Sequence, residues 1–178
     1  MLYSLLVLLI TVSTAFTATT TWDCGHDDKS IKINRAGVLP DPIPYPGNLT
    51  IDTELEVVRD IPSTGLAARL TLIKLEPERM LVDCINGIGS CVYDVCNELL
   101  PNNQVTFCQL GICQCPFTMK KYASTSLPYQ IQDLGGPVFG AIMQGNFEGN
   151  ITFFNKLDNK IYGCLGMKFK IQNTLSLA

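Results

Sequence analysis

Alternation of apolar and polar residues with a period of two is the feature that most constrains this chain. The stretch "LTIDTELEVV", residues 49–58, has polar and acidic residues at most of its even positions. The odd positions, which lie on the other face of an extended chain, are Leu49, Ile51, Thr53, Leu55 and Val57. Residues 161–171 repeat the pattern, and there Lys168 and Lys170 lie opposite Ile161, Leu165, Met167, Phe169 and Ile171. Because successive side chains of a strand point to opposite faces, each segment is predicted to be a strand with one buried face.

Three more segments, 66–75, 129–134 and 146–154, are also typical of strands. The one helical candidate is short, residues 93–100, where Asp94 is placed to help the first turn. No repeat or low-complexity linker interrupts the chain after residue 15. The sequence therefore predicts an all-β fold with at most a short helix, in a single domain over residues 16–178.

The stretch "LPDPIPYPGN", residues 39–48, places proline at every second position from 40 to 46. Proline lacks a backbone donor, so in an extended chain the missing N–H groups would all lie along one edge. One interpretation is an outer segment that pairs inward and resists pairing outward. The other is a polyproline-like loop. Both place the segment at the rim of a β-structure.

The first residues, 1–15, form an uncharged apolar run that ends in small residues. This is typical of a secretory signal peptide, here cleaved after about Ala15. A membrane anchor is the alternative, but the run is shorter than the ~20 apolar residues that span a bilayer. Two sequons agree with export and predict glycosylation at Asn48 and Asn150.

Eight cysteines follow the apolar run: Cys24, Cys84, Cys91, Cys96, Cys108, Cys113, Cys115 and Cys164. An even number in an exported chain predicts disulfides, although on the order of a hundred pairings are possible. A zinc site at Cys113 and Cys115 is the alternative, but their spacing is wrong for a C-x-x-C knuckle, so no metal is predicted. Six cysteines crowd into residues 84–115, a segment with too little core of its own to order without local bridges.

Composition excludes some functions. The chain has 13 basic and 16 acidic residues, a net charge of -3 and no basic cluster, which argues against nucleic acid as a partner. Hydrophobic residues make up 47% of the chain and charged residues 16%, so it either has a large core or lines a cavity with the surplus. The common hydrolase, zinc-protease, dinucleotide and P-loop motifs are absent from the sequence, and no cofactor is predicted.

The single histidine, His26, is the one candidate for a catalytic base. The "CGHDD" around it is similar to the His-Asp pair of secreted phospholipases, but their glycine-rich calcium loop is missing. A polar loop residue beside a disulfide is the other interpretation, and a small secreted lipase stays open as a rival function.

Residues 133–147, "DLGGPVFGAIMQGNF", combine many glycines with apolar side chains. The glycines and Pro137 predict that the segment forms no stable helix. An apolar loop is costly to expose in water and suited to contact lipid or a membrane surface. The predicted contact residues are Val138, Phe139, Ala141, Ile142 and Met143. The alternative is a plug over the core, and a lid over a lipid pocket would do both at different times.

Several motifs in fixed order resemble one family: "WDC" at 22–24, "PDPIPYPGN" at 40–48, "IGSC" at 88–91, "CQCPF" at 113–117 and "LP" at 127–128. They are similar, over about residues 22–171, to the lysosomal ganglioside activator proteins, within the MD-2-related lipid-recognition (ML) domains. That family acts as a non-enzymatic cofactor of β-hexosaminidase A. Two departures are a shorter segment between Cys96 and Cys108, and Phe139 as the nearest aromatic where the family's mobile loop carries a tryptophan.

The resemblance implies a β-cup, two antiparallel sheets around an apolar lipid cavity. It implies the disulfides Cys24–Cys164, Cys84–Cys91, Cys96–Cys115 and Cys108–Cys113, and makes Asn48 the family's glycosylation position. The implied function is to extract a glycosphingolipid from membranes and present it to a β-hexosaminidase-like hydrolase, in a secreted or lysosomal location. A general phospholipid, fatty-acid or sterol carrier, or a lipid sensor, on the same fold is the alternative.

Overall fold

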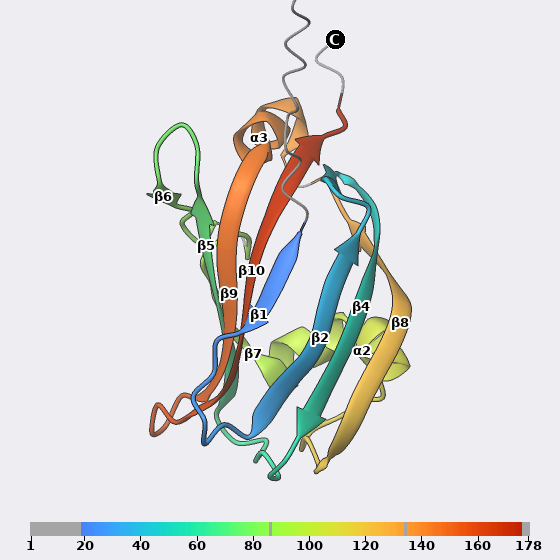
Figure 1. Ribbon diagram of the computed structural model, residues 1–178, viewed down its shortest axis with the longest axis vertical. Helices are drawn as coiled ribbons and strands as arrows, with labels where there is room; N and C mark the ends of the chain where they lie inside the picture. The colour runs from blue at the N-terminus through green and yellow to red at the C-terminus, as the bar shows by residue number, and fades with distance from the viewer. Residues whose placement is uncertain (1–18, 86, 134, 176–178) are drawn as a thin grey trace, which may run out of the picture.

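The computed structural model describes residues 19–85, 87–133 and 135–175, and the predicted signal peptide lies outside these residues. Two β-sheets face each other along the length of the molecule (Figure 1). The larger has the order β1-β10-β9-β5-β6, with β3 beside β10 and β7 beside β5. Its strands are β1 (Thr20–Asp23), β3 (Ile43–Tyr45), β5 (Leu66–Lys74), β6 (Met80–Leu81), β7 (Val92–Asp94), β9 (Gly145–Asn155) and β10 (Ile161–Asn173).

The smaller sheet has three strands in the order β2-β4-β8: β2 (Ile31–Leu39), β4 (Gly47–Val57) and β8 (Lys120–Ile131). All pairings in both sheets are antiparallel except that of β3 with β10. The predicted all-β class with two antiparallel sheets is therefore confirmed. Of the strand predicted over 129–134, residues 129–131 form the end of β8, which begins at Lys120; residues 132 and 133 lie outside it, and residue 134 is not among the described residues.

The period-two prediction is confirmed on β4. Leu49 and Val57 are buried, and Ile51, Thr53 and Leu55 between them face the space enclosed by the sheets. On β10 the prediction is wrong at one end, because the pairing with β9 shifts between Ile161 and Gly163. A bulge reverses the side to which later residues point. Ile161 is consequently exposed, and Tyr162 enters the core in its place.

Two further bulges shape the small sheet, one on each side of β4. On β2 the register shifts between Ile33 and Arg35, and on β8 it shifts opposite Ile51 and Thr53. Near the second shift Ser126 has a φ of 61°. Bulges bend and twist a strand. Here the extra residue of each bulge also reverses which side chains face inward, so that apolar residues face the interior both before and after it. Before its bulge β2 faces inward with Ile31 and Ile33, and after it with Ala36 and Val38.

The proline-rich stretch lies where the chain passes between the sheets. It leaves β2 in the small sheet, adds β3 to β10 in the large sheet, and returns to the small sheet as β4. β3 continues the edge of β10 beyond β1, with Ile43 and Tyr45 buried. The interpretation as a rim segment that pairs on one side fits residues 43–45, and the flanking residues are bends.

The helices are short. A π-turn η1 (Val95–Leu99) continues into α1 (Leu100–Asn102) and α2 (Gln104–Gln109), and α3 (Gly136–Met143) precedes β9. The predicted helix near residues 93–100 is confirmed, and its Asp94 accepts hydrogen bonds from the backbone N–H of Cys96 and Asn97. Helical structure also extends to α2 and α3, beyond the one short helix that the sequence predicts. None of the helices in the described ranges is long and apolar enough to span a membrane.

The prediction that glycines prevent a helix in residues 133–147 is wrong, because α3 forms there. The carboxylate of Asp133 accepts hydrogen bonds from the N–H groups of Gly135 and Gly136, and Pro137 stands in the first turn. Gly140 allows a close approach to β10, since a Cβ there would lie 2.8 Å from Cγ of Asn173. Tertiary contacts therefore outweigh the low helix propensity of this segment.

Four disulfides join Cys24 to Cys164, Cys84 to Cys91, Cys96 to Cys115 and Cys108 to Cys113. These are the pairs that the family resemblance implies. The first links the loop after β1 to the first part of β10, and the other three lie between residues 84 and 115.

Candidate functional site

An apolar cavity of about 340 Å³ lies between the two sheets. The small sheet contributes the inward side chains of β2, β4 and β8, and the large sheet contributes those of β1, β5, β9 and β10. Apolar side chains from the sheets that line the cavity include Ile33, Val38, Ile51, Leu55, Leu127, Ile151, Phe153, Leu165 and Met167.

Two clusters of buried hydrophobic residues close the ends of this cavity. At one end Ile31, Val95 and Phe117 belong both to a cluster and to the lining. At the other end a cluster of Tyr45, Leu72, Met143, Phe147 and Ile171 packs against the lining residues Val38 and Ile51. The cavity is thus an unfilled section of one long hydrophobic interior.

The helical segment η1–α2 forms a further wall. Leu99, Phe107 and Leu110 line the cavity from it. Its start is held by the Asp94 cap, and Cys96 is tied to Cys115. Partial burial raises the pKa of Asp94, but the N–H and side-chain hydrogen bonds of Asn97, together with nearby Lys156, hold it below its usual value. Asp94 is therefore a carboxylate at neutral pH and caps the turn in its strongest form.

Polar groups at the cavity are few and uncharged. They are the side chains of Thr21, Thr53, Asn103, Thr106 and Tyr129, and none of the described residues that line the cavity carries a charge. Tyr129 is 39% exposed, so the cavity reaches solvent beside it. The uncharged lining suits an apolar ligand body with a neutral polar end. Close to the opening, burial raises the pKa of Tyr93, and the proximity of Tyr129 raises it further.

Helix α3 sits at the end of the molecule away from α2 (Figure 1). Of the predicted contact residues, Met143 is buried in the second cluster, and Phe139 packs on Tyr45 with 5.7 Å between ring centroids. Ala141 is exposed, and Ile142 is 54% exposed. The side chain of Val138 lies outside what the structure describes. The four whose side chains are described thus divide between a plug over the core and an apolar outer surface, and none of these four lines the cavity.

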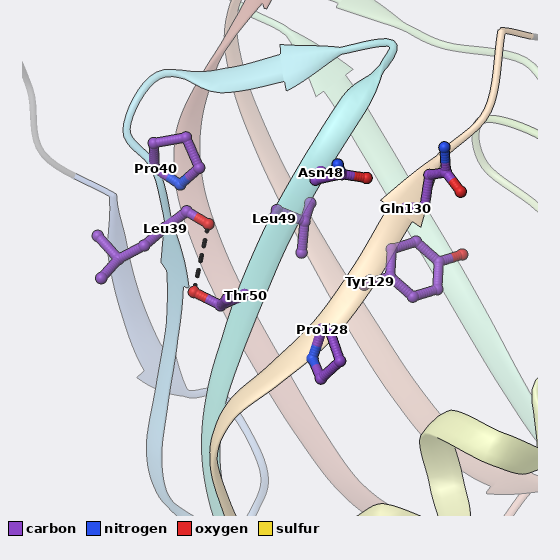
Figure 2. A pocket seen from close by; sticks show the side chains of 8 residues that line it. All are labelled: Leu39, Pro40, Asn48, Leu49, Thr50, Pro128, Tyr129 and Gln130. Atoms are coloured by element: carbon purple, nitrogen blue, oxygen red, sulfur yellow. Dashed lines mark hydrogen bonds between the residues drawn. The ribbon is translucent and has the colours of Figure 1, made fainter.

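A second concavity, of about 730 Å³, is open to solvent near the rim of the small sheet (Figure 2). It is lined by Leu39, Pro40, Asn48, Leu49, Thr50, Pro128, Tyr129 and Gln130. In Figure 2 Asn48 and Gln130 lie on adjacent strands, and the Thr50 hydroxyl donates to the Leu39 carbonyl at 3.5 Å. This shallow surface shares Tyr129 with the inner cavity and carries the first sequon.

His26 lies in the loop between β1 and β2, next to the Cys24–Cys164 disulfide, with an exposed side chain. It does not line the cavity, and its ring makes no hydrogen bond or ion pair within the described ranges. Within those ranges there is also no group of His, Cys, Asp or Glu side chains that could hold a metal ion. The position of His26 fits the interpretation as a polar loop residue.

Sequence reasoning missed the contribution of η1–α2 to the cavity. The sequence predicts a crosslinked region with little core of its own for the cysteine-rich segment. In the structure, five of its apolar side chains line the cavity: Val95, Leu99, Phe107, Leu110 and Ile112. Thr106 and Phe107 lie four and three residues before Leu110, a spacing that places all three on one face of a helix. This is the sequence signal that could have revealed the wall. Tyr129 was also missed, because a single tyrosine in a strand does not reveal which surfaces it joins.

Comparison with known proteins finds no family model and no curated protein that matches the chain. Among solved structures, it is similar to a Niemann-Pick type C2 protein from Japanese carpenter ant, with 12% identity, a TM-score of 0.48, and coverage of 86% of this chain and 99% of that one. It is also similar to chicken MD-1 in complex with lipid IVa, with 16% identity, a TM-score of 0.44, and coverage of 85% and 88%.

Proposed function

We propose that this protein is a non-enzymatic lipid-binding and lipid-transfer protein. The observation that carries the proposal is the uncharged, almost wholly apolar cavity between the two sheets. Transfer of an acyl chain from a bilayer into such a cavity exchanges one apolar environment for another. Little free energy is therefore gained or lost over the chain itself, and selectivity must come from polar groups near the opening.

The volume of the cavity limits its occupant. At about 340 Å³ it lies near the lower end of the roughly 300–1,000 Å³ typical of ligand pockets. A single hydrocarbon chain or a compact ring system suits this volume, and a two-chain lipid requires the sheets or a helix to move apart. Such an opening is compatible with α3, which closes one end through side-chain packing and an exposed hydrogen bond from Lys74, and which carries no disulfide.

The finer proposal is that the lipid is a glycosphingolipid, presented to a β-hexosaminidase-like hydrolase in a secreted or lysosomal location. The order of motifs in the sequence supports membership of the ML-domain group and the ganglioside activator function within it. Asn103, Thr106 and Tyr129 are neutral hydrogen-bonding groups at the cavity, which suits a sugar better than a phosphate. Under this proposal Ala141 and Ile142 touch the membrane while lipid is extracted.

A general carrier of fatty acids, phospholipids or sterols is the second candidate. The absence of charged groups among the described lining residues favours it, because nothing there selects one headgroup strongly. The small lipase is the weakest candidate, since its one histidine lies outside the cavity.

Native mass spectrometry of the secreted protein, followed by identification of the released lipid, tests these proposals. A stoichiometric glycosphingolipid supports the activator function and calls for a search for the hydrolase. Phospholipids or mixed fatty acids support the general carrier instead. A protein that neither retains lipid nor takes it up from vesicles contradicts lipid binding altogether. If it then hydrolyses a lipid ester and His26→Ala abolishes that activity, the lipase is correct.

A further inference from the structure

Four residues form a row across the outer face of the large sheet. Trp22 on β1 pairs with Gly166 on β10, Gly166 pairs with Asn150 on β9, and Asn150 pairs with Thr71 on β5. Directly paired residues of antiparallel strands point to the same side of a sheet. Their neighbours Thr21, Met167 and Ile151 line the inner cavity, so this row faces outward.

The indole of Trp22 lies over Gly166. A Cβ on Gly166 would fall within 2.6 Å of Cζ2 of this ring, so the missing side chain leaves the space that the indole occupies. Trp22 nevertheless remains 40% exposed. Covering the bare backbone of a strand glycine is a known structural role of aromatic residues and explains the contact with Gly166. It leaves the exposed side of the ring without a role.

A groove of about 300 Å³ extends from Trp22 across this face. Its lining includes Thr71, Glu148 and Asn150. Glu148 carries a carboxylate that pairs with Arg79 at 3.2 Å and with Lys168 at 3.6 Å. The groove thus combines one aromatic face with hydroxyl, amide and carboxylate groups. A pyranose ring has matching chemistry, with C–H groups that stack on the negative face of an aromatic ring and hydroxyls that bond to polar neighbours.

Asn150 begins the sequon Asn150-Ile151-Thr152, and its side chain is only partly buried at the groove. We propose that Asn150 carries an N-linked glycan whose first sugar lies in this groove against the exposed face of Trp22. The glycan thereby covers the centre of the large sheet, which excludes this face from contact with membranes or a protein partner. The inference does not depend on the proposed lipid-binding function.

The other sequon provides a contrast. The row through Asn48 on the outer face of the small sheet contains Gln130, and the adjacent row contains Leu39, Thr50 and Pro128. Tyr129, next to Gln130 on β8, belongs to the row of Leu49, which faces the core, and Tyr45 on β3 is buried. A glycan at Asn48 therefore has no tryptophan beside it, and only the Asn150 glycan is expected to change the environment of Trp22.

The test uses the full chain secreted from a eukaryotic host, with Trp22 as the single tryptophan. Glycopeptide mass spectrometry first measures occupancy at Asn150. Acrylamide quenching of tryptophan fluorescence then compares Asn48→Gln protein, which keeps only the Asn150 glycan, with Asn48→Gln/Thr152→Ala protein, which has no glycan but retains Asn150. Quenching is expected to be roughly two-fold weaker with the glycan, because the stack removes one ring face from water.

Two controls separate stacking from misfolding. Asn150→Gln protein keeps the Asn48 glycan and Asn150→Gln/Thr50→Ala protein lacks it; residue 50 lies on the small sheet, away from Trp22, so the quenching of these two proteins is expected to be equal. An endoglycosidase that trims the folded Asn48→Gln protein to its first sugar is expected to leave the protection of Trp22 unchanged, even if the unglycosylated variant fails to fold. An unoccupied Asn150, equal quenching with and without its glycan, or loss of protection on trimming to the first sugar each overturns the proposal.

Discussion

The ammonium group of Lys74, on β5, donates a hydrogen bond to the backbone carbonyl of Ile142, near the end of α3, at 2.6 Å. Lys74 also lies 5.9 Å from the centroid of the Phe147 ring. The last carbonyls of a helix lack partners within the helix and attract cations. Lys74 therefore holds the C-terminal end of α3 against the large sheet, and Asp133 holds the opposite end.

Replacing Lys74 with methionine is expected to loosen α3 while the sheets stay intact. The exposed hydrogen bond contributes about 1 kcal/mol, which corresponds to roughly five-fold faster local opening. Hydrogen exchange of amides in residues 139–143 measures this, with Lys32→Met on the exposed side of β2 as the matched control. Unchanged exchange in the Lys74 variant would show that packing alone holds α3 in place.

Adjacent residues of α3 are expected to respond differently to substitution. Met143→Ala removes a buried side chain and should lower the free energy of unfolding by about 2–5 kcal/mol. Ile142→Asn changes an exposed side chain and should alter stability by less than about 0.5 kcal/mol. If α3 contacts membranes, Ile142→Asn should nevertheless slow lipid extraction from vesicles. Equal extraction rates in this variant and the unmodified protein would argue against membrane contact by α3.

Filling the cavity is expected to weaken lipid binding without unfolding the protein. Ala36 lines the cavity from β2, so Ala36→Phe places a ring in the empty space. The control is Lys32→Phe, which adds the same ring to the outer side of the same strand. Lipid retained per protein, measured by native mass spectrometry, should fall by about ten-fold in the first variant, a loss of about 1.4 kcal/mol, and stay unchanged in the second. Full retention by Ala36→Phe would place the lipid site elsewhere.

Asp23 connects the end of β1 to β2. Its carboxylate accepts hydrogen bonds from the N–H of Gly25 at 2.8 Å and of Ile33 at 3.1 Å, and pairs with Lys29 at 3.1 Å. Partial burial raises the pKa of Asp23, but the two N–H donors and Lys29 outweigh it and lower the pKa overall. The folded state therefore binds this proton less tightly than the unfolded chain does.

The stability of the protein therefore depends on pH through Asp23. A lowered pKa in the folded state stabilises it fully above the ordinary aspartate value of 3.8, and this stabilisation is lost as pH falls through the folded value. Asp23→Asn should lower stability by about 1–3 kcal/mol at neutral pH and flatten its loss toward pH 3. Urea denaturation at pH 7, 5 and 3 measures both effects. Lys29→Met, which spares the N–H bonds, should have a smaller effect; an equal one would assign the stabilisation to the ion pair.

The pKa values of Asp94 and Glu148 are also lowered, the first by the cap at η1 and the second mainly by Arg79. Both contribute in the same direction, so Asp23→Asn should remove only part of the acid sensitivity. Complete loss of acid sensitivity in Asp23→Asn would indicate that these other carboxylates are not ionised more easily in the folded state.

Local patterning was enough to identify β4, β5, β9 and most of β10, because alternation is written into consecutive residues and each strand buries one face. It was also enough for the cap at Asp94, where the donors lie only two and three residues away. The excess of apolar residues left open a large core or a lined cavity, and the structure has two buried clusters with a cavity between the sheets.

The tertiary structure decided what depends on distant partners. The bulge that exposes Ile161 arises from pairing with β9, and nothing near Ile161 in the sequence announces it. Helix α3 exists in a glycine-rich segment because Asp133 and Lys74 hydrogen-bond to its two ends and Met143 packs into the core. The same holds for the cavity wall from α2 and for the row of Trp22, Gly166 and Asn150, which bring together residues far apart in sequence. The free energy of such contacts depends on packing, so no local pattern in the sequence predicts them.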